Sequence, residues 1–155
     1  MRYLFVMVLL LSGCTSPPAT PTQAPTNELL LYRNTLIGDN SQVLAIIYDL
    51  PEARNFLQLA LHTTEPPYSA HLIYDEVTHP KIVSIANATW LFTLVPNVDS
   101  LQFTFDTQSY TLTREQLMSW YGKDVTASTN EADIQLLIDA YTADPVEVDA
   151  LFETK

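Results

Sequence analysis

Apolar and polar positions follow two different periods along the middle of the chain, and these periods predict helices and strands in turn. Apolar residues recur at helical spacing up to Pro51, which ends the pattern and predicts a helix over residues 41–50. A second pattern predicts a helix over residues 81–95, with apolar residues almost all round it. A helix of this kind must be buried on more than one side.

A strand-like alternation before the second helix predicts a first hairpin. It joins residues 57–61 to residues 70–74 through a four-residue loop at 65–68. In this register residue 61 lies opposite residue 72, which places every leucine of the hairpin on one face.

A similar alternation after the second helix predicts a second hairpin. It joins residues 101–105 to residues 110–112 across residues 106–109. Residue 103 then lies opposite residue 112, and one face of the hairpin is again apolar while the other is polar.

A third helix is predicted directly after the second hairpin. Thr113 and Gln116 have the spacing of a capping box, and Gly122 suits the end of the helix. Residues 28–125 thus predict the order helix, hairpin, helix, hairpin, helix. This order favours an α+β domain with a mostly antiparallel four-stranded sheet and helices packed on it.

Residues 126–155 predict an acidic, helical C-terminal extension. Its first helix is expected over residues 131–143, and Asp144-Pro145 is expected to begin the second. The apolar stripes of this helical pair are Ala132, Leu136, Leu137, Ala140 and Tyr141 in the first helix, and Val148, Leu151 and Phe152 in the second. Two interpretations stay open: the pair covers the second face of the buried helix or the sheet, or it is an amphipathic segment that binds a partner.

The N-terminus has the features of an export signal. Residues 1–13 contain one positive charge, an apolar run and a Leu-Ser-Gly sequence before Cys14, the single cysteine of the chain. This segment resembles a bacterial lipoprotein signal peptide, which implies cleavage before Cys14 and attachment of a lipid to its thiol. A membrane-spanning helix needs roughly 20 apolar residues, more than the segment offers. A secretory signal without lipidation is the other interpretation.

Residues 15–27 predict a tether between the lipidated Cys14 and the folded domain. They contain four prolines, four threonines and no charge, so they favour extended polyproline geometry over a core. At about 3.1 Å per residue, the tether could hold the domain roughly 40 Å from the bilayer. The expected location is therefore extracytoplasmic, on the outer face of the bacterial cell membrane, with the lipid on Cys14 as the membrane contact.

Charge and composition exclude several classes of function. The chain has 18 acidic and 7 basic residues, which gives a net charge of −11 and disfavours binding to nucleic acid or to anionic lipid headgroups. A single cysteine excludes an intramolecular disulfide, and the three glycines are too far apart for a phosphate-binding loop.

Catalytic and metal-binding motifs are not found in the sequence. There is no GxSxG or HExxH motif, so no enzyme activity and no cofactor are expected. His62 and His71 lie opposite each other in the predicted register and could supply two metal ligands. No third ligand lies beside them in that pattern, so no metal site is expected.

A recognition surface is a more plausible function for the polar loops. The candidate residues are Glu65, Pro66, Pro67, Tyr68, Trp120 and Tyr121. Prolines order a loop before binding, and exposed aromatic rings supply contact area at low entropic cost. The alternative interpretation of the two aromatic residues of the third helix is that they belong to the core.

Several segments resemble a known family. They are Tyr32–Val43, Leu59–Tyr68, Asn87–Phe92, Val95–Asp99 and Tyr110–Asp124, and they are similar to the domain-of-unknown-function family 4825 of Gram-positive bacteria. Members are extracytoplasmic domains, some on lipoproteins and some on membrane sensors such as metallopeptidase-type receptors or anti-sigma factors. The resemblance implies a ligand- or protein-binding module in envelope sensing or signalling and assigns no catalytic residue. A structural or assembly lipoprotein of the cell envelope is the alternative.

Overall fold

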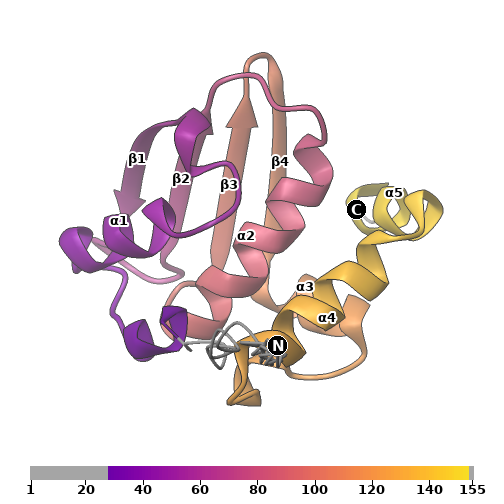
Figure 1. Ribbon diagram of the computed structural model, residues 1–155. Coiled ribbons are helices and arrows are strands. Elements are labelled where there is room, and N and C mark those ends of the chain that lie inside the picture. Colours follow the sequence, from indigo (N-terminus) through magenta and orange to yellow (C-terminus); the bar gives the residue numbers. More distant parts are fainter. Residues whose placement is uncertain (1–27, 154–155) are drawn as a thin grey trace, which may run out of the picture.

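A four-stranded sheet with helices against one of its faces forms the centre of the protein (Figure 1). The computed structural model describes residues 28–153. In chain order the elements, with η for 3-10 helices, are η1 (Leu29–Tyr32), α1 (Asn40–Tyr48), η2 (Ala53–Asn55), β1 (Phe56–His62), β2 (Ser69–Tyr74), α2 (Pro80–Leu94), β3 (Ser100–Phe105), β4 (Gln108–Thr113), α3 (Arg114–Tyr121), η3 (Val125–Ala127), α4 (Glu131–Thr142) and α5 (Pro145–Glu153). The α+β class is therefore confirmed.

The sheet is mixed, with the strand order β1-β2-β3-β4. β1 and β2 pair antiparallel, as do β3 and β4, whereas the central pair of β2 and β3 is parallel. The prediction of a mostly antiparallel sheet missed this pair. Its cause is α2, because a crossover helix between two neighbouring strands returns the chain to the same end of the sheet and makes the strands parallel.

Both predicted hairpin registers are wrong by two residues. Leu61 lies opposite Ala70 instead of residue 72, and the loop spans residues 63–68. Phe103 lies opposite Tyr110 instead of residue 112, which shortens the second turn to residues 106–107. A shift of two residues keeps every side chain on its face, so alternation in the sequence cannot distinguish the two registers.

Helix α2 is the most deeply buried element, in agreement with its apolar pattern. All of its residues from Val83 to Leu94 are buried. One side packs against the inner face of the sheet, where Leu72, Phe103 and Leu112 are fully buried. The remaining sides are covered by the N-terminal segment and by the C-terminal helices, which α2 also contacts.

The C-terminal extension packs against the domain. Ile134 and Ile138 of α4 and Val148 and Leu151 of α5 are buried. The N-terminal segment is tied to the same region, because the backbone N–H of Leu30 donates to a carboxylate oxygen of Glu131 at 2.9 Å. The guanidinium of Arg33 also donates to the carbonyls of residues 126 and 128. These contacts favour the packing interpretation over a free segment.

The predicted inward stripe of α4 is wrong in part. Leu136 is 66% exposed, and Ala132 and Ala140 are also exposed, whereas Leu137 and Tyr141 are half-buried. The buried stripe follows the spacing i, i+3, i+4, i+7 from Ile134. Both stripes have helical spacing, and packing against α2 selects the one with the two isoleucines.

None of the helices within residues 28–153 combines the length and the apolar character that crossing a membrane requires. The predicted signal peptide, Cys14 and the tether at 15–27 lie outside the described residues.

Candidate recognition surface

The predicted recognition loop is exposed and fixed at one end. Glu65, Pro66 and Pro67 are exposed, while Tyr68 is half-buried. The backbone N–H of Tyr68 donates to a carboxylate oxygen of Asp99 at 2.8 Å, and its carbonyl accepts from the backbone N–H of Asp99 at 2.8 Å. The loop is therefore held against the start of β3.

The two aromatic residues predicted to join this loop lie elsewhere. Tyr121 is 2% exposed, and its hydroxyl is hydrogen-bonded to Thr89 of α2 at 2.8 Å. Its ring contacts the rings of Trp120 and Tyr141 at centroid distances of 5.0 and 4.9 Å. Tyr121 is thus a core residue, and the prediction that it belongs to the recognition surface is wrong.

Trp120 occupies an intermediate position. It is half-buried and lines an open cleft of about 610 Å³ between α3 and α5, together with Gln116 and Leu151. Its indole N–H has no hydrogen-bond partner within residues 28–153. The ring of Trp120 packs against the ring of Tyr141 at a centroid distance of 5.1 Å, which accounts for its half-buried position.

The buried Tyr121 hydroxyl makes stability sensitive to alkaline pH. Burial raises the pKa of Tyr121 from 10.0 to about 12, although its hydrogen bond with Thr89 acts in the opposite direction. Burial likewise raises the pKa of Tyr74. Because the pKa is higher in the folded state, the contribution of Tyr121 to the free energy of unfolding is fully present below pH 10. This contribution decreases as the pH rises towards 12.

We expect Tyr121→Phe to cost about 1 kcal/mol at pH 7, because it removes one buried hydrogen bond. We also expect the decrease in unfolding free energy between pH 10 and 12 to be smaller in the variant than in the wild type. Urea unfolding at a series of pH values measures both effects. An equally steep alkaline decrease in the two proteins would show that Tyr121 does not titrate with unfolding.

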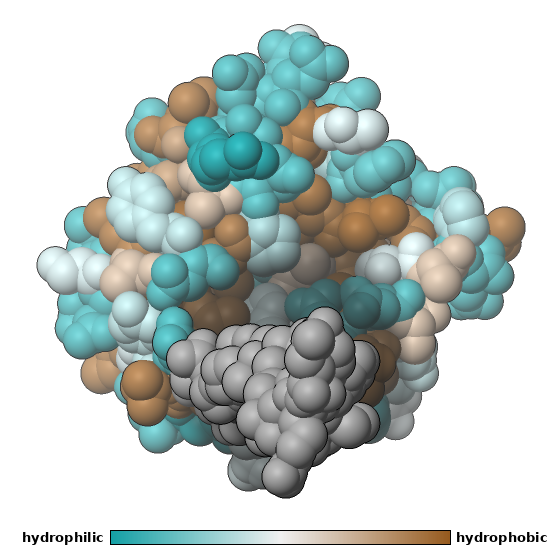
Figure 2. All heavy atoms as spheres, viewed as in Figure 1, coloured by the Kyte–Doolittle hydropathy of each residue, from teal (hydrophilic) through white to brown (hydrophobic). Residues whose placement is uncertain are grey.

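The other face of the sheet is not covered by helices in the described structure. Its outward residues, called the open sheet face here, are Gln58, Ala60, His62, Ser69, His71, Ile73, Ser100, Gln102, Thr104, Ser109 and Thr111. All of them are exposed or half-buried. The four strands contain no Asp, Glu, Lys or Arg, although the chain has a net charge of −11. Figure 2 shows the opposite, helical side of the molecule, where hydrophilic and hydrophobic residues intermingle.

A chain of hydrogen bonds crosses three strands of the open sheet face. His71 Nε2 is hydrogen-bonded to Thr104 Oγ1 at 2.9 Å, and Thr104 Oγ1 is hydrogen-bonded to Ser109 Oγ at 2.8 Å. The two histidines considered as metal ligands are not opposite each other, since His62 pairs with Ser69 and His71 with Ala60. Within the described part of the chain, no three metal-ligating side chains come together.

The two edges of the sheet differ. On β4, the ring of Tyr110 contacts the ring of Phe152 from α5 at a centroid distance of 5.1 Å. On β1, none of the hydrogen bonds outside the sheet that join described residues involves the backbone of residues 57–62. Leu57 on this strand is 63% exposed. The sequence could not identify β1 as the free edge, because that depends on which strands of the two hairpins become neighbours.

Comparisons with known proteins identify a family and no individual relative. No curated protein and no solved structure matches the chain. A family model described as Domain of unknown function (DUF4825) matches residues 29–115, a range close to that of the segments resembling this family, which run from Tyr32 to Asp124. The match includes the whole sheet and ends at the start of α3. Because it covers more than half of the 155 residues, the chain belongs to the DUF4825 family.

Proposed function

We propose that this protein is a surface lipoprotein of the bacterial cell envelope, whose α+β domain binds a polypeptide partner in envelope sensing or signalling. The Leu-Ser-Gly sequence before Cys14 supports the lipid anchor, and the uncharged tether at 15–27 supports display of the domain at a distance from the membrane. The proposal includes no catalytic step and no cofactor.

The open sheet face is the observation that carries the proposed binding function. Desolvating a charged side chain costs more free energy than desolvating a hydroxyl, an amide or an apolar group. The centres of protein interfaces are accordingly depleted in charged residues. In a chain with 18 acidic residues, an uncovered face without formal charge is the surface that a partner can cover at the lowest cost.

Site-specific cross-linking in the native cells tests this assignment. A photoreactive amino acid at Thr111 samples the open sheet face, and the same amino acid at Ala140 samples the exposed side of α4; both positions are exposed. We expect a cross-linked product of defined mass from position 111 and none from position 140. Products from position 140 alone would place the binding surface on the helical side and contradict the proposal.

The lipid anchor has a separate test. We expect Cys14→Ala to shift the protein from the membrane fraction to the soluble or secreted fraction, or to leave an unprocessed precursor, because the thiol is the expected site of lipidation. Two acyl chains anchor a protein stably, so loss of the lipid has a large effect. Fractionation and mass spectrometry of the N-terminus measure the outcome. Membrane retention of the wild type with an unmodified Cys14 would reject the anchor.

A further inference from the structure

We propose that the free edge of β1 binds an extended, basic segment of the partner as a fifth strand of the sheet. This inference rests on the proposed function, and it specifies which kind of segment of the partner binds at the edge of the open sheet face. Addition of a strand to an exposed sheet edge is a common form of peptide recognition, in which backbone hydrogen bonds supply affinity and alternate side chains supply specificity.

Within residues 28–153, the backbone of β1 is available for pairing. It is the first strand in the order β1-β2-β3-β4, so alternate residues direct their N–H and C=O groups away from β2. A β-bulge lies between Phe56 and Gln58, and residues 58–62 pair regularly with β2. Five regularly paired residues leave a straight edge at which a short strand could add.

The usual protection of an edge strand is weak on β1. Natural sheet edges are protected against pairing by charged side chains, by proline, by bulges or by a covering element. The sequence of β1, Phe-Leu-Gln-Leu-Ala-Leu-His, contains neither a charged residue nor proline, and its bulge affects only the first residues. A free edge without this protection is typical of a strand that pairs with another chain.

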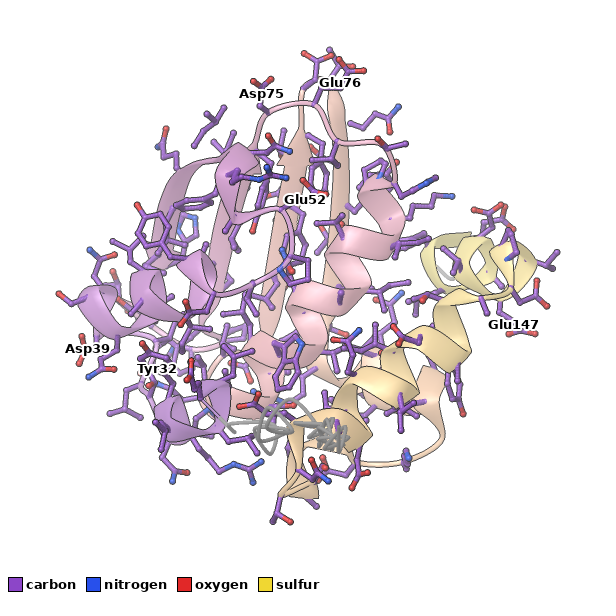
Figure 3. All side chains as sticks on the ribbon, in the orientation of Figure 1. Tyr32, Asp39, Glu52, Asp75, Glu76 and Glu147 are labelled. Atoms are coloured by element: carbon purple, nitrogen blue, oxygen red, sulfur yellow. The ribbon has the colours of Figure 1, made fainter. Side chains whose placement is uncertain are left out.

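The charges around β1 favour a basic partner. Residues 49–76 contain five acidic residues and one basic residue, Arg54. Asn55, just before β1, donates through its side chain to Glu52 at 2.7 Å and accepts from the backbone N–H of Asp75 at 2.7 Å. Asp75 lies at this end of the sheet, whereas Glu76 lies beside the turn between β3 and β4 (Figure 3). A second copy of this chain would bring another charge of −11 to the same place, so electrostatics disfavours self-pairing.

Apolar contacts are also available at the start of the strand. Leu57 is 63% exposed and Tyr48 of α1 is 61% exposed. The Tyr48 ring packs edge-on against Phe56 at a centroid distance of 5.9 Å, which fixes its position beside β1. Since side chains of a strand alternate between faces, the segment that fits this edge alternates apolar and basic residues.

Amide hydrogen exchange of the full-length chain in detergent micelles tests the proposal. The probe is a blocked seven-residue peptide of alternating valine and lysine. Two control peptides accompany it: one has the same side chains with alternate backbone amides methylated, and the other has glutamate in place of lysine. We expect the valine–lysine peptide to slow exchange in residues 57–62, and we expect neither control to do so.

A pair of charge variants checks the location. Ala60→Lys adds a positive charge on β1, and Ala140→Lys adds one at an exposed position on α4, outside the open sheet face. We expect Ala60→Lys to weaken peptide binding by about tenfold and Ala140→Lys to change it little, with unchanged melting temperatures in both. If either variant melts early, the methylated peptide remains the decisive control.

Three outcomes in which exchange is slowed would overturn strand addition. They are equal protection by the methylated peptide, protection confined to other residues, and protection of β1 that increases with protein concentration without any peptide. The last result would identify a second copy of the chain as the occupant. Cross-linking from position 111 together with no protection of β1 would retain the proposed binding function and reject only the fifth strand.

Discussion

Ending the chain after residue 125 is expected to abolish cooperative folding. The helices that this truncation removes bury Ile134, Ile138, Val148 and Leu151 against the rest of the protein. Burial of one such side chain contributes roughly 1.5–3 kcal/mol, so four of them approach the roughly 5–15 kcal/mol of a typical domain. The truncated chain would also expose one side of α2, a helix buried from Val83 to Leu94.

Circular dichroism during heating and limited proteolysis measure this effect. We expect the truncated protein to lose its melting transition and to be cleaved rapidly, since it would present a large apolar patch. An unchanged melting temperature would show that α4 and α5 contribute nothing to the core. In that case the extension would be the segment reserved for a partner.

Two substitutions on α4 refine the test on a chain of full length. Ile138→Ala is expected to cost about 2–5 kcal/mol, because Ile138 is 2% exposed and its removal leaves a cavity. Leu136→Ala is the matched control, and we expect a change within about 0.5 kcal/mol because Leu136 is 66% exposed. Urea unfolding of both variants measures the difference. Equal effects would contradict the orientation of α4.

Replacing Arg114 with alanine is expected to lower stability by about 2–4 kcal/mol. Its guanidinium donates to the carbonyls of Phe92, Val95 and Val98 at distances of 2.7–3.1 Å, all at or just after the end of α2. The group also lies 4.9 Å from the centroid of the Phe92 ring. Without it, the carbonyls of Phe92 and Val98 lose this donor in a partly buried site, and the carbonyl of Val95 keeps only the backbone N–H of Val98 at 3.4 Å. The loop that leads into β3 also loses its anchor.

Arg114→Lys provides the comparison. A lysine keeps the positive charge but cannot reproduce the planar fork of donors, so we expect it to recover less than half of the lost stability. Burial lowers the pKa of Arg114, with Asp99 and Asp124 acting in the opposite direction. Thermal unfolding at neutral pH measures all three proteins. Full stability in Arg114→Lys would show that charge alone, and not the directed hydrogen bonds, matters at this position.

The type and position of most elements can be predicted from the sequence, because the apolar periodicity and the capping residues of each element indicate the same structure. The predicted helices at 41–50 and 81–95 correspond to Asn40–Tyr48 and Pro80–Leu94. The capping side chain of Thr113 accepts from the backbone N–H of Gln116, and Gly122 has a φ of 64°, as expected for these helix ends. These features depend on neighbouring residues and can be inferred without the tertiary structure.

Features that depend on distant residues could not be predicted. Alternation fixes the face of each strand but not a shift of two residues, so both hairpin registers were misplaced. The parallel pairing of β2 with β3 depends on the path of α2 across the sheet. Tyr121 was expected at the surface and is buried, whereas Leu136 was expected in the core and is exposed. In both helices, packing against α2 decides which side is buried.

The candidate site was predictable in part. The exposure of Glu65, Pro66 and Pro67 agrees with a surface loop. The open sheet face was not recognised, because its residues belong to two hairpins that become one sheet only through the pairing of β2 with β3. The absence of charged residues from all four strands is the signal in the sequence that could have indicated it.

The most direct test of the open sheet face as the binding surface compares two identical substitutions. Gln102→Arg places a charge at an exposed position on β3, and Gln135→Arg places the same charge at an exposed position on α4. The measurement is the dissociation constant for the partner captured from position 111, determined by titration calorimetry with both variants folded. We expect Gln102→Arg to weaken binding by about tenfold or more and Gln135→Arg to leave it unchanged. Weaker binding in Gln135→Arg alone, or no change in either variant, would contradict the assignment of the open sheet face as the recognition surface.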